Sequence, residues 1–176
     1  MIAVVPDRSN RSYKSPVPNT DALLRIAYSA AESGDLDHAR RCYEQGAALG
    51  DSMCIHALGY MHDVGEGVPE NKSLAMKLYR KAWRLGSHAS ACNIAILYRE
   101  QGRIGMMFRW YQRVAAAGDG SAHLEMAKCY LTGSGVRKNP EAGLRCLAVA
   151  IGSQYISEHE REEAHALLAE ISPRLV

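Results

Sequence analysis

The residues of this 176-residue chain that could support metal or redox chemistry are its five cysteines and seven histidines. The cysteines stand at positions 42, 54, 92, 129 and 146, so no two have the close spacing of a metal-binding pair. Their number is odd, whereas a secreted domain held together by disulfides more often has an even number. We therefore interpret the cysteines as small apolar residues packed between helices.

The histidines and hydroxyl residues do not form a recognisable catalytic pattern either. His159 and Glu160 resemble the start of a zinc-protease helix, but Glu163 stands where that motif requires its second histidine. His56 and His62 are six residues apart, which does not place them on one helix face. The sequence thus predicts no catalytic residue, no metal site and no cofactor, and we expect a protein that is not an enzyme.

Two Gly-x-Gly segments, at 65–67 and 133–135, could suggest a phosphate-binding loop. A P-loop needs Lys followed by Ser or Thr after its glycines, and a dinucleotide fingerprint needs a preceding strand. Neither feature is present. Both segments are followed by Val and, three residues later, by Asn71 or Asn139. They therefore indicate a turn that occurs twice, with a positive backbone φ at Gly67 and Gly135.

Composition narrows the class of protein further. Hydrophobic residues make up 47% and charged residues 23%, which argues against intrinsic disorder. The net charge of +2 is too balanced to favour a nucleic-acid partner, and no apolar run is long enough for a membrane span. We expect a cytoplasmic protein with a flexible, proline-containing leader at residues 1–19 and one domain at 20–176.

A repeat organises the chain from residue 20 onward. A small residue follows a larger apolar one in each of four repeats, and these small residues are spaced by 32, 36 and 32 positions. A large residue suited to anchor a second helix recurs at spacings of 36, 32 and 36. Each large residue precedes the next small one by 16 positions, so only the turn inside a repeat varies, by four residues. The small residues are Ala27, Gly59, Ala95 and Ala127, and the large ones are Tyr43, Tyr79, Tyr111 and Leu147.

The repeats must be helix hairpins, because apolar residues recur at helical spacing and strand alternation is absent. A small residue lets two helix backbones approach closely, and a tyrosine fills the space beside it. The segment 157–171 begins with Ser157, which is expected to be its N-cap, and carries an apolar stripe. We expect this last helix to cover the open end of the stack.

At these residues the chain resembles the Sel1-like repeat family of tetratricopeptide-like proteins. The resemblance is carried by the Gly-x-Gly-Val turns, and the second repeat matches best, with Leu58, Gly59, Tyr79, Lys81 and Ala82 also in pattern. It implies an all-α fold, a right-handed α-α superhelix of about four hairpins plus a C-terminal capping helix. It also implies an adaptor that binds another protein, while the balanced charge and the short apolar runs favour neither a nucleic-acid nor a membrane partner.

The resemblance further implies that the first helix of each hairpin lines a concave groove. Apolar and polar side chains mix along this row, as they do on surfaces that bind polypeptides. An apolar segment at 106–110 is interpreted as core, with an exposed docking edge as the alternative. A bacterial immunity or antitoxin protein is the alternative function, and an enzyme with an unrecognised site is less favoured. The candidate partner-binding residues are Tyr28, His56, Tyr60, Asp63, Cys92, Ile96, Arg99, Lys128 and Leu131, on a row that also holds Leu24, Ala31 and Leu124.

Overall fold

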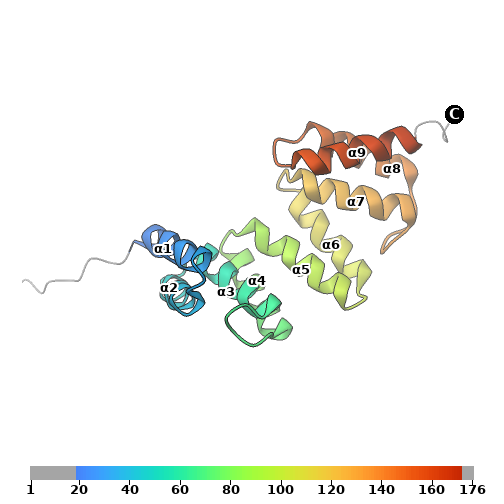
Figure 1. Ribbon diagram of the computed structural model, residues 1–176. Coiled ribbons are helices and arrows are strands. Elements are labelled where there is room, and N and C mark those ends of the chain that lie inside the picture. Colours follow the sequence, from blue (N-terminus) through green and yellow to red (C-terminus); the bar gives the residue numbers. More distant parts are fainter. Residues whose placement is uncertain (1–18, 172–176) are drawn as a thin grey trace, which may run out of the picture.

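The structure is a computed structural model that describes residues 19–171. The expected leader therefore lies outside the described residues except for Asn19, as does the end of the expected domain at 172–176. Within the described part, every regular element is a helix (Figure 1). The helices are α1 (Thr20–Glu32), α2 (Leu36–Ala48), α3 (Ser52–Val64), α4 (Lys72–Arg84), α5 (His88–Glu100), α6 (Ile104–Ala115), α7 (Gly120–Thr132), α8 (Pro140–Gly152) and α9 (Glu158–Ile171).

Successive helices pack in pairs, and each pair contacts the next along the chain. The four hairpins are α1–α2, α3–α4, α5–α6 and α7–α8, and α9 packs on α8 with a smaller contact to α7. Figure 1 shows the hairpins following one another along a curved row, with α9 at its end. The predicted all-α superhelix of four hairpins and a capping helix is confirmed.

The two Gly-x-Gly turns adopt the predicted backbone. Gly67 and Gly135 have φ values of +69° and +72°, and the side chains of Asn71 and Asn139 cap α4 and α8. Space is also restricted at these turns. A Cβ atom on Gly135 would lie 2.5 Å from the backbone oxygen of Ile104, so the turn of the fourth repeat rests directly on the start of α6.

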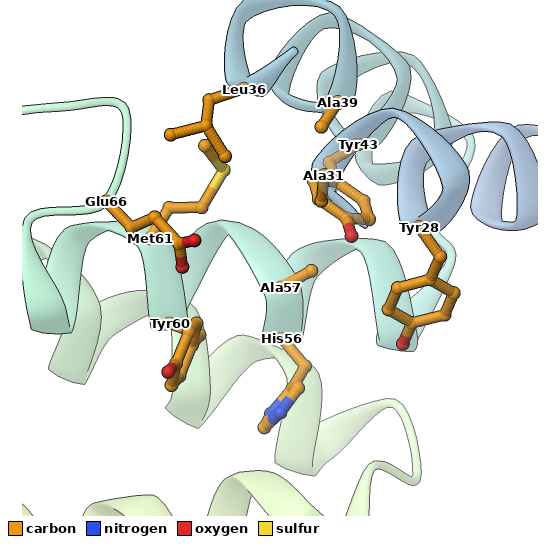
Figure 2. A pocket seen from close by; sticks show the side chains of 10 residues that line it. All are labelled: Tyr28, Ala31, Leu36, Ala39, Tyr43, His56, Ala57, Tyr60, Met61 and Glu66. Atoms are coloured by element: carbon orange, nitrogen blue, oxygen red, sulfur yellow. The ribbon is translucent and has the colours of Figure 1, made fainter. Parts of the chain in front are cut away.

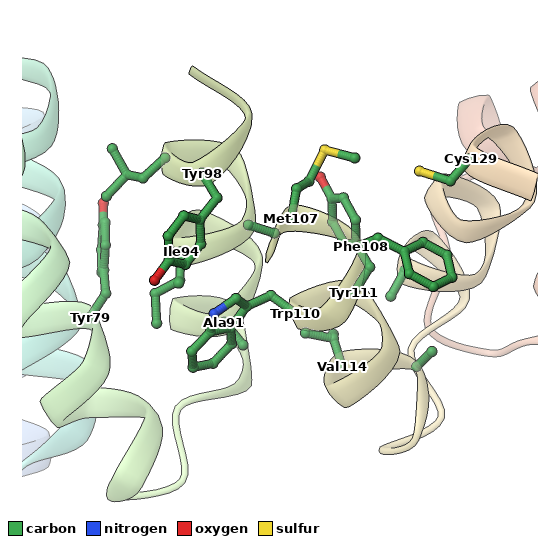
Figure 3. Packing of buried hydrophobic residues seen from close by; sticks show 14 of the residues in the cluster. Tyr79, Ala91, Ile94, Tyr98, Met107, Phe108, Trp110, Tyr111, Val114 and Cys129 are labelled. Carbon is green, nitrogen blue, oxygen red and sulfur yellow. The ribbon is translucent and has the colours of Figure 1, made fainter. Parts of the chain in front are cut away.

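The core is a line of side-chain clusters along the stack. The largest cluster lies in the middle, where α4, α5, α6 and α7 meet around Tyr79, Ile94 and Trp110 (Figure 3). Separate clusters lie among α1, α2 and α3 and among α7, α8 and α9. The predicted close approaches are present. Ala27, Ala95 and Ala127 are fully buried, and the ring of Tyr79 lies so close to the Gly59 backbone that a Cβ there would be 2.8 Å from it.

Three local predictions also agree with the structure. Ser157 and Glu160 form a reciprocal capping box at the start of α9: the backbone N–H of each residue donates to the side chain of the other. In the 106–110 segment, Met107, Phe108 and Trp110 are buried, as the core interpretation requires. All five cysteines are free thiols packed between helices, with positions 42, 54 and 129 buried.

Candidate binding groove

The predicted groove residues lie on α1, α3, α5 and α7 with very different degrees of exposure. Tyr28 and Tyr60 present large aromatic surfaces, with 43% and 47% of each residue exposed. Asp63 is only 8% exposed, and Leu124 is a core residue. Arg99 is exposed, and the other five candidate residues are half-buried: His56, Cys92, Ile96, Lys128 and Leu131.

Three of the predicted residues line one pocket between the first two hairpins. Its volume is about 320 Å³, and Tyr28, His56 and Tyr60 contribute to its wall. Figure 2 shows the lining side chains arriving from α1, α2, α3 and the turn after α3. Ala31, from the same row, also lines the pocket, whereas the remaining members of the row do not. The sequence prediction missed most of its remaining wall, formed by Leu36, Ala39, Tyr43, Ala57, Met61 and Glu66.

His56 is held in the pocket wall by neighbouring side chains and carries no charge. Its Nδ1 atom lies 2.9 Å from the Ser90 hydroxyl, which is itself hydrogen-bonded to Ser87. The imidazole also contacts the ring of Tyr79, with the ring centroids 5.5 Å apart. Burial lowers the pKa of His56, so the ring is neutral at pH 7. His56 therefore adds no positive charge to the pocket.

Asp63 belongs to a buried polar cluster inside the second hairpin. Its two carboxylate oxygens accept hydrogen bonds from Lys72 Nζ at 2.8 Å and from the Tyr79 hydroxyl at 3.1 Å. Lys72 also approaches Glu100 at 3.3 Å, and its hydrogen bond to Asp63 raises the pKa of its ammonium group. The Asp63 carboxylate thus links α3 to α4 and presents little surface to a ligand.

A second polar cluster joins the C-terminal half of the row. Arg99 on α5 faces Glu125 on α7 at 3.8 Å, and Lys128 bridges Glu125 and Glu163 at 2.8 Å each. These ion pairs connect α5, α7 and α9. Because many of the charged groups of the row are paired with neighbouring helices, the exposed tyrosines of the first two hairpins are its most available binding surface.

The pocket has no arrangement for covalent chemistry. Burial raises the pKa of Tyr43 and of the nearby Cys54 thiol to about 12 each, so both are protonated and unreactive at neutral pH. Across residues 19–171, no three His, Cys, Asp or Glu side chains gather as metal ligands. The same part of the chain has no helix with the length and apolar character that crossing a membrane requires.

A row of helix hairpins with a side pocket and unreactive side chains defines a helical-repeat scaffold. The chain belongs to the Sel1 repeat family, because the family model matches residues 21–51, 52–87, 108–119 and 120–151, more than half of the sequence. Members of this family are generally non-catalytic and bind proteins. No curated protein matches the chain.

Solved structures show the same fold. A Sel1 repeat protein from Oxalobacter formigenes is 21% identical over 87% of this chain, with a TM-score of 0.72. A protective antigen of uropathogenic Escherichia coli with an SLR fold is 25% identical over 87% of this chain, with a TM-score of 0.71. The chain spans 62% and 33% of these two structures. An immunity protein from Pseudomonas aeruginosa is 16% identical over 88% of this chain and 82% of its own, with a TM-score of only 0.43.

Proposed function

We propose that this protein binds a polypeptide partner along the groove formed by α1, α3, α5 and α7, with its main contact at the first two hairpins. The observation that carries the proposal is the pair of half-exposed rings, Tyr28 and Tyr60, beside the 320 Å³ pocket. Tyrosine is enriched at protein interfaces because it buries a large apolar ring while keeping a polar end. Binding would proceed by shape and a few anchoring side chains, without covalent chemistry.

The test is capture of the native partner by the full chain and by two variants. Changing both Tyr28 and Tyr60 to Ala should remove the partner, since central aromatic anchors contribute about 2 kcal/mol or more each. The matched control is Tyr155→Ala, because Tyr155 is 71% exposed and lies between α8 and α9. If the double variant and the control retain the partner equally, and the helical circular dichroism is unchanged, the interface does not include this surface.

The narrower role of an immunity protein rests on the general resemblance of short Sel1-like proteins to stoichiometric toxin inhibitors. It predicts that co-expression rescues cells from a toxin encoded beside this gene. The double variant at Tyr28 and Tyr60 should lose that rescue together with partner capture. Growth arrest that persists with every neighbouring gene product would exclude this role and leave the general binding proposal standing.

A further inference from the structure

The pocket between the first two hairpins lies where three polar side chains of the next repeat unit have apolar equivalents. In the second repeat, the Tyr79 hydroxyl donates to Asp63 and is also hydrogen-bonded by the Asn93 side chain. Lys72 completes this cluster by pairing with Asp63. These four polar groups fill the space between α3, α4 and α5.

The equivalent positions of the first repeat carry apolar residues. Tyr43 corresponds to Tyr79, and the repeat spacing places Ala31, Ala57 and Leu36 where Asp63, Asn93 and Lys72 stand in the second repeat. Tyr43 and these three residues all line the 320 Å³ pocket, with Ala57 coming from α3, the next helix along the chain, just as Asn93 comes from α5. Within the described residues no side chain hydrogen-bonds the Tyr43 hydroxyl.

The third repeat shows that the first is the exception among the repeats that carry this tyrosine. There the equivalents of Asp63 and Asn93 are Arg99 and Glu125, which approach each other at 3.8 Å. Burial and the Glu125 carboxylate raise the pKa of the Tyr111 hydroxyl, and Arg99 lowers it in part. A polar pair therefore accompanies the tyrosine in the second and third repeats and is replaced by two alanines in the first.

The charge of the pocket indicates what kind of group would occupy it. Glu66 is the one acidic residue among the ten that line it, His56 is uncharged, and neither Lys nor Arg is present. The Tyr43 hydroxyl offers an oxygen with no partner within the described part of the chain. Tyr28 and Tyr60 add two aromatic rings, and such rings attract cations. Figure 2 places Glu66 and Tyr60 on one side of the pocket and Tyr28 on the other, with Ala57 between them.

We propose that this pocket receives an arginine side chain of the polypeptide partner. The aliphatic stem would pack on Ala31, Ala57 and Leu36, and the guanidinium would donate to Glu66 and to the Tyr43 oxygen. A guanidinium suits this site because it combines several donors with a flat face that stacks on aromatic rings. The inference rests on the proposed polypeptide binding and specifies one anchor of that interaction.

The test uses short peptides as probes of the full-length chain. Acetylated and amidated Ala-Arg-Ala is titrated into the ¹⁵N-labelled protein, with Ala-citrulline-Ala as the neutral isostere of the same shape. We expect saturable shifts at the amides of the pocket residues with a Kd on the order of 1 mM. We expect the citrulline peptide to bind about fivefold more weakly, which matches one ion pair of about 1 kcal/mol in water.

Two matched variants test whether the Glu66 carboxylate is the group that attracts arginine. Glu66→Gln should weaken the arginine peptide by about fivefold and remove its advantage over citrulline. Glu70→Gln, which makes the same change of charge in the same turn outside the pocket, should leave both affinities unchanged. Equal binding of the two peptides, an equal effect of the two variants, or no saturable shift at the pocket would each overturn the arginine assignment.

One further variant tests whether the occupant belongs to this chain. The N-terminal segment carries Arg8, Arg11 and Lys14, and all three are changed to Gln in the full-length protein. If this variant alters the pocket resonances in the absence of peptide, the leader occupies the site and the partner assignment is wrong. If the Tyr28 and Tyr60 double variant loses the native partner but the arginine peptide does not bind the pocket, this inference is overturned and the proposed function stands.

Discussion

Removing a single hydroxyl from each of two equivalent tyrosines tests how the first repeat differs from the second. Tyr43 and Tyr79 are nearly equally buried, with exposures of 4% and 0%, and Phe preserves the ring in both cases. The Tyr79 hydroxyl donates to a buried carboxylate at 3.1 Å, and a hydrogen bond to a charged group contributes about 1.5–3 kcal/mol. Tyr79→Phe should therefore lower the free energy of unfolding by about 2 kcal/mol.

Tyr43→Phe should behave differently, because its hydroxyl faces the pocket and has no hydrogen-bond partner within the described residues. We expect a change within about 0.5 kcal/mol. The measurement is urea-induced unfolding of the two variants and the parent protein, followed by far-ultraviolet circular dichroism at pH 7. Equal destabilisation by the two substitutions would refute the reasoning, because it would show that the Tyr43 hydroxyl is satisfied within the folded protein.

Two further predictions concern the turns and the C-terminal cap. Gly135→Ala should lower the free energy of unfolding by about 1–3 kcal/mol more than Gly102→Ala. Both glycines have positive φ, but only the first would bring a Cβ against the backbone of Ile104, so equal costs in urea unfolding would contradict that contact. Ser157→Ala should cost about 1 kcal/mol by thermal unfolding at pH 7. Partial burial raises the pKa of Glu160, but hydrogen bonds from Ser157 outweigh burial, so the net effect is a lowered pKa. The contribution of Glu160 to stability is therefore fully present above its unfolded pKa of about 4.3 and is lost as the pH falls through its lower pKa in the folded protein. The cost should therefore shrink at acidic pH, and an unchanged cost there would exclude the Glu160 contribution.

The repeat spacing predicted the fold because each hairpin depends on local signals. The alternation of 32 and 36 residues located the hairpins, and Asn71 and Asn139, which recur after the two turns, are the N-caps of α4 and α8. These features act within one hairpin or between neighbours, which is the range over which a solenoid is stabilised. The covering role of α9 followed from the same reasoning, because an open last hairpin would leave apolar surface exposed.

The binding surface was harder to predict because it depends on what each side chain does with its neighbours. The groove row was chosen by position alone, which treats Tyr60 and Asp63 as equivalent candidates. The structure shows that Asp63 is occupied by Lys72 and Tyr79, whereas the Tyr60 ring remains half-exposed. Glu66 was missed because it lies in a turn of the backbone and not on the predicted helix face. Comparing the three tyrosine environments along the sequence could have indicated the gap at Ala31 and Ala57.

That comparison bears on how a stack of similar hairpins acquires a distinct binding site. Polar side chains tie α3 to α4 in the second repeat, and α5 to α7 where the third repeat meets the fourth. The same interactions occupy the space between helices, so a repeat that has them offers little room for a ligand. Around Tyr43 the equivalent positions hold Ala31 and Ala57, which offer its hydroxyl no hydrogen bond and line a cavity. A binding pocket in this architecture can thus arise by deleting side chains from the packing pattern, because the unpaired tyrosine already supplies the polar group that a ligand would use.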